Sequence, residues 1–240
     1  MSDIDSPAGG SSSRRLFTDY PPVTIALIVA CVCVMIAQYF WPQVYIDLAY
    51  HPYIAHYEPY RFISSAFLHS GFWHLVINML SLWIIGRITE PMFGAGRFLT
   101  IYFLSAIAGN VVATFIGYLM NQEYVIVGAS GAIFGLFGAL IVVAQAGHVP
   151  MKSFYIVLAI NIAFSLLWPQ VSWQSHLGGL ITGALIIELW FMVAKVCRRY
   201  AGIASVMRKN PRYLVAVNVL TACLFIAALL YPMYMYSDRI

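Results

Sequence analysis

The stretch Gly128-Ala129-Ser130-Gly131 opens a long apolar segment, Ser130–Gly147, and puts one hydroxyl group at its start between glycines. A second reactive side chain, His176, stands at the start of a later apolar segment, Ser175–Val196. Apolar segments of this length are candidates for membrane-spanning helices. We predict that the Ser130 and His176 side chains meet inside the bilayer.

The composition predicts an all-α polytopic membrane protein. Of the 240 residues, 62% are hydrophobic and 9% are charged, whereas a soluble domain is about half apolar and about one quarter charged. The only clearly polar segment is residues 1–20, which we expect to be a disordered cytoplasmic tail. Asp3 and Asp5 argue against a transit peptide, and the apolar run that follows is long enough to span a membrane.

The cysteines predict neither a disulfide framework nor a metal site. Cys31 and Cys33 are two positions apart, so in a helix they point in different directions, while Cys197 and Cys223 stand alone. No zinc spacing and no cofactor motif is present, so we expect buried, inert thiols and no cofactor. The net charge of +4 is explained better by membrane topology than by nucleic acid binding.

The hydropathy pattern predicts seven spans. They cover Pro22–Phe40, Trp73–Thr89, Phe98–Met120, Ser130–Gly147, Ser153–Trp168, Ser175–Val196 and Tyr213–Tyr234. We expect residues 21–200 to form a membrane core, and residues 201–240 to form a basic linker and an additional C-terminal span.

The basic residues predict the orientation. With a cytoplasmic N-terminus, the inner side collects Arg14, Arg15, Arg87, Arg97, Lys152, Lys195, Arg198, Arg199, Arg208, Lys209 and Arg212. The outer side then holds only Arg61 and Arg239. The excess of inner charge predicts a multi-pass protein of the plasma or inner membrane, with the C-terminus outside.

This topology gathers polar side chains at one depth. The second, fourth and sixth spans all enter the bilayer from the outer face, and the residues near their starts include His74, Ser130 and His176. The loop between the first two spans is rich in aromatic residues. We expect this loop to lie partly in the outer leaflet; an ordinary aromatic belt explains it equally well.

Two glycine pairs predict close packing of the fourth and sixth spans. Gly131 and Gly135 are four residues apart, as are Gly179 and Gly183. Such small-xxx-small pairs let helix backbones approach closely, although generic membrane packing also uses them. Each pair begins near a reactive residue, so the contact would bring Ser130 within hydrogen-bond reach of the histidine.

Ser130 and His176 together suggest nucleophilic catalysis. A serine hydroxyl becomes a nucleophile when a neighbouring base, usually histidine, removes its proton. No Asp or Glu lies near either residue, so we expect a dyad whose imidazole is oriented by packing. Phe134, one turn below Ser130, is well placed to stack on the ring. For Ser130 alone, the competing interpretation is a helix N-cap.

A pocket for a negatively charged oxygen is also predicted. His74 and Asn78 share a helix face, and the Ser130 backbone N–H is exposed at a helix start. Donors of this kind stabilise the oxyanion that forms when a carbonyl is attacked. We include Gly128 in this oxyanion and substrate-binding set, and expect His69 to support the loop. A metal site of three histidines ranks lower, because no carboxylate or cysteine completes it.

Two acidic residues near the cytoplasmic side are expected to be structural. Glu188 lies within the sixth span, where we expect it to snorkel or to pair with a basic residue. Glu90 is expected to lie near Arg97 at the turn between the second and third spans.

These residues resemble the rhomboid intramembrane serine proteases. The resemblance rests on His69-Ser70-Gly71-Phe72-Trp73-His74-Leu75-Val76-Ile77-Asn78, on Gly128-Ala129-Ser130-Gly131, and on His176 followed by Gly179 and Gly183. It implies a six-helix core with an appended seventh helix, a nucleophile at Ser130, a base at His176, and oxyanion donors at His74 and Asn78. Phe134 stands where the family often has tyrosine.

Three functions are compatible with the sequence. The first is an endopeptidase that cuts transmembrane protein substrates near the outer membrane face. Its expected partners are these substrates and the lipid bilayer, and no nucleic acid is expected. The second is a non-catalytic protein that binds membrane helices. The third is a transporter, which would require internal repeats and a midplane site; the sequence shows no convincing repeat.

Overall fold

The computed structural model describes residues 20–55, 57–122, 125–147, 152–168 and 171–199. These residues form a helical bundle without strands, and their one β-type pairing is an isolated antiparallel bridge between Tyr50 and Ile126. The long helices are α1 (Pro22–Phe40), α5 (Phe72–Phe93), α6 (Ala95–Met120), α7 (Ser130–Gly147), α8 (Lys152–Leu167) and α9 (Trp173–Arg199). The short ones are α2 (Gln43–Leu48), α3 (Pro52–Ala55), α4 (Arg61–Ser64) and the 3-10 turn η1 (Ser65–Phe67).

Five of the described helices, namely α1, α5, α6, α7 and α9, are long and apolar enough to cross a membrane. The apolar part of α8, Phe154–Leu167, is shorter. The chain is therefore an all-α, multi-pass membrane protein, as its composition predicts. The seventh predicted span, Tyr213–Tyr234, lies outside the described residues, as do the linker before it and the predicted N-terminal tail up to residue 19.

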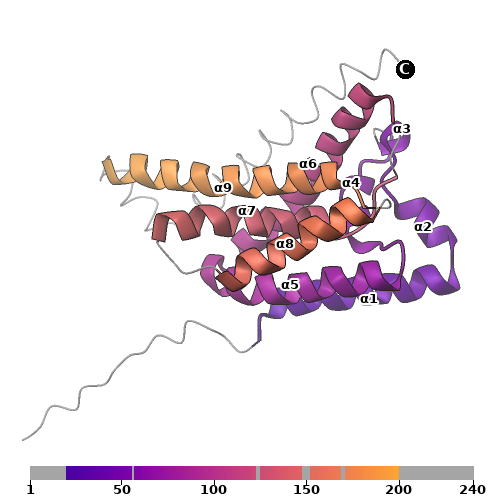
Figure 1. The fold of residues 1–240 in the computed structure, drawn as a ribbon, viewed down its shortest axis with the longest axis horizontal. Helices are drawn as coiled ribbons and strands as arrows, with labels where there is room; N and C mark the ends of the chain where they lie inside the picture. The colour runs from indigo at the N-terminus through magenta and orange to yellow at the C-terminus, as the bar shows by residue number, and fades with distance from the viewer. Residues whose placement is uncertain (1–19, 56, 123–124, 148–151, 169–170, 200–240) are drawn as a thin grey trace, which may run out of the picture.

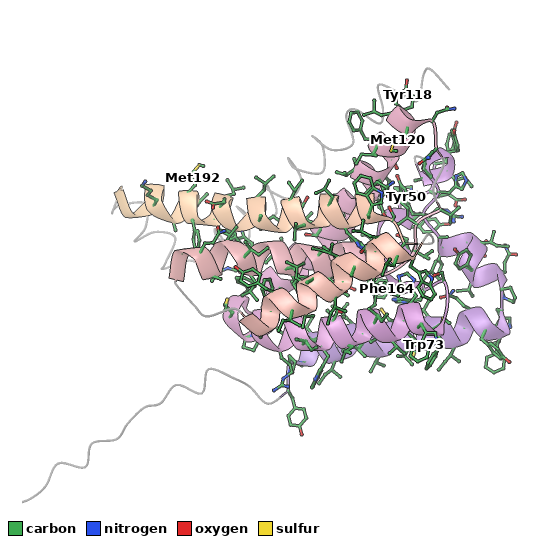
Figure 2. All side chains as sticks on the ribbon, in the orientation of Figure 1. Tyr50, Trp73, Tyr118, Met120, Phe164 and Met192 are labelled. Carbon is green, nitrogen blue, oxygen red and sulfur yellow. The ribbon has the colours of Figure 1, made fainter. Side chains whose placement is uncertain are left out.

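The core of the bundle is α7. It packs against α9, α6 and α5, and it is the most buried of the five spans (Figure 1). Apolar side chains also cover the outside of the bundle, where Trp73 and Met192 project from different helices (Figure 2). An apolar exterior of this kind suits a surface that faces lipid.

The loop between α1 and α5 folds around the buried side chain of Arg61. Its Nη1 donates to the carbonyl oxygens of Ile46 and Ala49 at 2.7 and 2.8 Å, and its Nε lies 2.5 Å from the Glu58 carboxylate. The hydrogen bond from Arg61 lowers the pKa of the Glu58 carboxyl below its usual value. The predicted position of this loop in the outer leaflet stays a prediction.

Both ends of α1 are fastened by polar groups. At its start, the Glu90 carboxylate accepts hydrogen bonds from Val23 N–H at 2.9 Å and from the N–H and hydroxyl of Thr24, each at 2.7 Å. A carboxylate is favourable there because the first N–H groups of a helix lack partners. At its other end, the Gln38 amide makes hydrogen bonds to the backbone N and O of His69, at 3.1 and 3.0 Å.

These bonds confirm that Glu90 is structural and identify its partner. Glu90 binds the start of α1 and forms no ion pair with Arg97 in the described part of the chain. The Arg97 guanidinium lies instead over the Trp190 ring, 5.8 Å from its centroid. Glu188 is exposed on α9 and has no ion pair among the described residues.

The predicted contact between the glycine pairs is present between α7 and α9. A Cβ atom on Gly179 would overlap the carbonyl oxygen of Gly131, and a Cβ on Gly183 would overlap that of Gly135. The two backbones therefore touch along this seam, which leaves no room for a side chain. Close backbone approach through small residues is how helices associate in lipid.

The helix α8 contacts α5 and α9. Its Asn161 side chain lies against Ser81 of α5, whose Oγ is 3.0 Å from Asn161 Oδ1 and 2.9 Å from Nδ2. Its Phe154 ring packs on Phe137 of α7, with centroids 5.2 Å apart. A buried polar contact thus fixes the position of α8 along α5.

We predict that Gly183→Ala destabilises the fold by about 1–3 kcal/mol, because the new methyl group would push α9 away from the Gly135 carbonyl. The measurement is thermal unfolding in detergent, followed by circular dichroism. Gly96→Ala is the control, since nothing lies within 4 Å of a Cβ at that position. Equal unfolding temperatures for both variants would contradict the tight seam.

We predict that Glu90→Gln destabilises the fold by about 1–3 kcal/mol, because it replaces by an amide the carboxylate that accepts three hydrogen bonds, two of them buried. The exposed Glu188→Gln is the matched control and should not lower the unfolding temperature. The same melting experiment measures both. A neutral Glu90→Gln would show that α1 is held by its apolar contacts alone.

Candidate active site

Ser130 is the first residue of α7, and a short extended segment leads into it. Ile126 exchanges backbone hydrogen bonds with Tyr50 at 2.9 and 3.1 Å, and Gly128 N–H donates to the Ser65 carbonyl at 2.9 Å. The φ angle of Gly128 is +122°, a conformation that glycine adopts without strain. The segment before Ser130 is thus fixed by backbone hydrogen bonds to Tyr50 and to Ser65.

The Ser130 side chain does not cap its own helix. It is half-buried, and its hydroxyl makes no hydrogen bond with any residue that the structure describes. A capping serine would accept a hydrogen bond from a backbone N–H two or three residues further on. The N-cap interpretation is therefore not supported.

Ser175, in the first turn of α9, lies against both α7 and α6. A Cβ at Gly131 would come within 2.9 Å of the Ser175 Oγ, and a Cβ at Gly109 of α6 within 2.6 Å. Ser175 thus fits between two glycines, one of which directly follows Ser130. The residue after Ser130 and the residue before His176 are therefore in contact.

His176 is buried and its ring is held by an aromatic neighbour. The Phe134 ring lies parallel to the imidazole, with centroids 4.2 Å apart and an angle of 12° between the planes. The predicted stacking is confirmed. Because Phe134 lies one turn below Ser130, this contact also brings the imidazole to the first turns of α7.

The two ring nitrogens of His176 have different surroundings. Nδ1 lies 2.5 Å from the hydroxyl of Ser165 on α8, whereas Nε2 is buried and has no partner among the described residues. The expectation that packing alone orients this ring is therefore incomplete. Ser130 and His176 share no hydrogen bond in the structure, and such bonds often tighten only when a substrate binds.

His74 lies beside the same loop. A Cβ at Gly128 would be 2.9 Å from His74 Nε2 and 3.6 Å from Ser130 Oγ, so both atoms lie beside the space in front of Gly128. His74 Nδ1 is 3.4 Å from the backbone N and 3.0 Å from the hydroxyl of Ser70. A backbone N–H can only donate, so Nδ1 accepts and the proton is on Nε2. That Nε2 is buried and unpaired in the described structure.

Asn78 and His69 lie next to His74. The Asn78 amide donates one N–H to the His74 carbonyl at 2.8 Å, so its second N–H remains to serve a ligand. The His69 ring meets the His74 ring edge to face, with centroids 5.2 Å apart. Burial, with a smaller effect of His74, lowers the pKa of His69 to about 3, so its ring is neutral at physiological pH.

The residues that sequence reasoning missed are Ser165, Ser175, Ser70 and Gly109. Ser70, four residues before His74, and Ser175, directly before His176, carried a local signal. The described residues contain no group of three or more His, Cys, Asp or Glu side chains that could hold a metal ion.

Comparison with known proteins agrees with these features. The Rhomboid domain family model matches residues 56–193, and Rhomboid protease GluP of Bacillus subtilis is 37% identical over 135 residues, which are 54% of this chain and 26% of GluP. RHOMBOID-like protein 6, mitochondrial, of Arabidopsis thaliana is 37% identical over 133 residues, 52% of this chain and 42% of that protein.

A shorter relative matches over most of its length. YdcA of Bacillus subtilis is 36% identical over 152 residues, 61% of this chain and 74% of YdcA. The chain thus spans less than half of the first two relatives and about three quarters of the third. The family model covers more than half of the chain, including α5 to α8 and His176 of α9. The chain therefore belongs to the rhomboid family.

Proposed function

We propose that the protein is an intramembrane serine endopeptidase, with Ser130 as nucleophile and His176 as general base. The observation that carries this proposal is the buried Nε2 of His176, which has no hydrogen-bond partner among the described residues and whose ring stacks on Phe134 beside the first turn of α7. A buried nitrogen without a partner is costly. An unpaired ring nitrogen of this kind is expected in a histidine that exchanges a proton with a substrate or a nucleophile. The name of the relative GluP, a rhomboid protease, supports the same reaction class.

The reaction begins when His176 Nε2 takes the Ser130 proton and Oγ attacks the substrate carbonyl carbon. The resulting tetrahedral intermediate collapses, the C–N bond breaks, and Nε2–H gives its proton to the leaving amine. A water molecule then attacks the acyl group and gives its proton to Nε2. Breakdown of this second intermediate returns the proton from Nε2 to Ser130 Oγ and releases the acid.

The negative oxygen of the intermediate is bound by nearby donors. His74 Nε2–H, the remaining N–H of Asn78 and the Ser130 backbone N–H supply them, and Gly128 leaves the space in front of His74 open. Preorganised donors of this kind are worth about 3 kcal/mol each. The seam of Gly131, Gly135, Gly179 and Gly183 positions the two catalytic turns, and His69 supports the ring of His74.

The substrates in this proposal are transmembrane segments of other proteins. The catalytic turns lie at the ends of α7 and α9 that we assign to the outer membrane face, with the N-terminus of the chain in the cytoplasm. Water reaches a shallow site at that face, and a substrate helix must unwind there to expose its peptide bond. The site needs no cofactor, because serine and histidine complete the proton transfers.

We expect the purified protein, reconstituted in liposomes, to cleave a fluorescent transmembrane substrate, and Ser130→Ala to abolish cleavage, since the nucleophile is gone. A fluorophosphonate probe, which reacts with activated serines, should label the wild-type protein at Ser130 and leave the variant unlabelled. Thr100→Ala removes a hydroxyl whose one hydrogen bond in the described structure is to the Gly96 carbonyl, and this control should retain full activity.

Cleavage by Ser130→Ala would refute the assignment of the nucleophile. If the wild-type protein neither cleaves any of a panel of transmembrane substrates nor reacts with the probe, the endopeptidase proposal fails, and the second candidate is a non-catalytic binder of membrane helices. Retained binding of the substrate helix by this inactive protein would identify that second function.

We predict that His74→Leu lowers kcat by about 10²–10³, the cost of one oxyanion donor, with little change in KM. His74→Gln keeps an N–H donor in the same region and should retain part of the rate. Steady-state kinetics on the reconstituted substrate measures both variants. Equal rates for the Leu and Gln variants would exclude hydrogen bonding as the role of His74.

A further inference from the structure

The ring of His176 is held from α8 as well as from α7. Ser165, on α8, is buried, and its hydroxyl oxygen lies 2.5 Å from His176 Nδ1. The same oxygen lies 2.7 Å from the carbonyl oxygen of Asn161, one turn earlier on α8. Ser165 thus connects the imidazole to the backbone of another helix.

The protons of this chain of contacts can be assigned from its acceptors. The Asn161 carbonyl can only accept, so the single hydroxyl proton of Ser165 points to it. If that proton pointed to His176 instead, the two oxygens would face each other at 2.7 Å without a hydrogen between them. The Ser165 oxygen therefore accepts, and His176 Nδ1 carries the ring proton. Neutral imidazole has one such proton, so Nε2 presents its lone pair.

We propose that Ser165 is a positioning residue for the reaction, which holds His176 as the Nδ1–H tautomer and orients Nε2 as the base. This inference rests on the proposed function. When Nε2 takes the serine proton, Nδ1–H keeps its acceptor, so the ring needs no reorientation during the reaction. The role resembles that of the third member of a serine–histidine–carboxylate triad, filled here by a neutral hydroxyl.

The position of Ser165 depends in turn on α5. The Asn161 side chain lies against the Ser81 hydroxyl, and its Nδ2 also donates to the Val157 carbonyl at 2.9 Å. Asn161 is buried, so this polar contact fixes α8 one turn away from Ser165. The tautomer of the base is therefore linked to the docking of α8 on α5.

The first experiment is kinetic. Ser165→Ala removes the acceptor, and kcat should fall roughly 10- to 100-fold with KM unchanged, as part of the contribution of a general base is lost. Ser165→Thr keeps the hydroxyl and should restore most of the rate. Thr100→Ala, which removes a hydroxyl with the same local backbone bond but no histidine partner, is the matched control.

The second experiment observes the tautomer directly. In protein labelled with 15N-histidine, the His176 signals, assigned by their loss in His176→Asn, should show a protonated Nδ1 and an unprotonated Nε2. In Ser165→Ala the two shifts should move toward the values of exchanging tautomers. This spectrum does not depend on any substrate, and the wild-type measurement stands even if Ser165→Ala unfolds.

The outcomes separate the two proposals. If the wild-type protein cleaves and Ser130→Ala does not, but Ser165→Ala keeps the wild-type kcat, the role of Ser165 is refuted and the protease assignment stands. A wild-type spectrum with Nε2 protonated also refutes the role of Ser165. If the wild-type protein is inactive toward substrate and probe, the protease assignment fails, whatever the tautomer.

Discussion

The structure depends on direct backbone contact between α7 and α9. In lipid, helices gain nothing from hiding apolar surface from water, so their association relies on close packing. The glycines of both helices remove the side chains that would separate them, and the carbonyls of Gly131 and Gly135 lie where Cβ atoms would be. The contact aligns the two helices along their length. As a result, Ser130 and His176 occupy neighbouring turns although 45 residues, from 131 to 175, separate them in sequence.

Two histidines of the site differ in what binds their Nδ1 atoms. A backbone N–H of Ser70 makes Nδ1 of His74 an acceptor, and the Ser165 oxygen makes Nδ1 of His176 a donor. Since a neutral ring has one proton, the Nε2 atoms then have opposite character. One can donate to a negative oxygen and the other can remove a proton. Identical side chains thus suit two steps of the proposed reaction because of their neighbours alone.

The sequence predicts much of this arrangement, because several of its signals are local. The bounds of α1 and α7 agree with the apolar runs, and the spacing of Phe134 below Ser130 predicts the stacked ring. The glycine pairs predict the seam. In contrast, Ser165 is a common residue on a different helix, and no spacing connects it to His176. The structural role of Glu90 was predicted, but its partner was not, because no local signal connects it to the distant start of α1.

The fastening of α1 at both ends has a consequence for how this part of the chain can vary. Its start is held by Glu90 and its finish by Gln38, while few of its residues between them are buried. The middle of α1 needs only apolar residues and sufficient length, whereas its two ends need side chains that form these hydrogen bonds. Homologues should therefore vary widely in the sequence of α1 and keep the polar groups that bind its two ends. The family match starts at residue 56 and does not include α1. Gln38 bonds to His69, whose ring contacts His74, so a helix outside the matched domain supports the candidate active site.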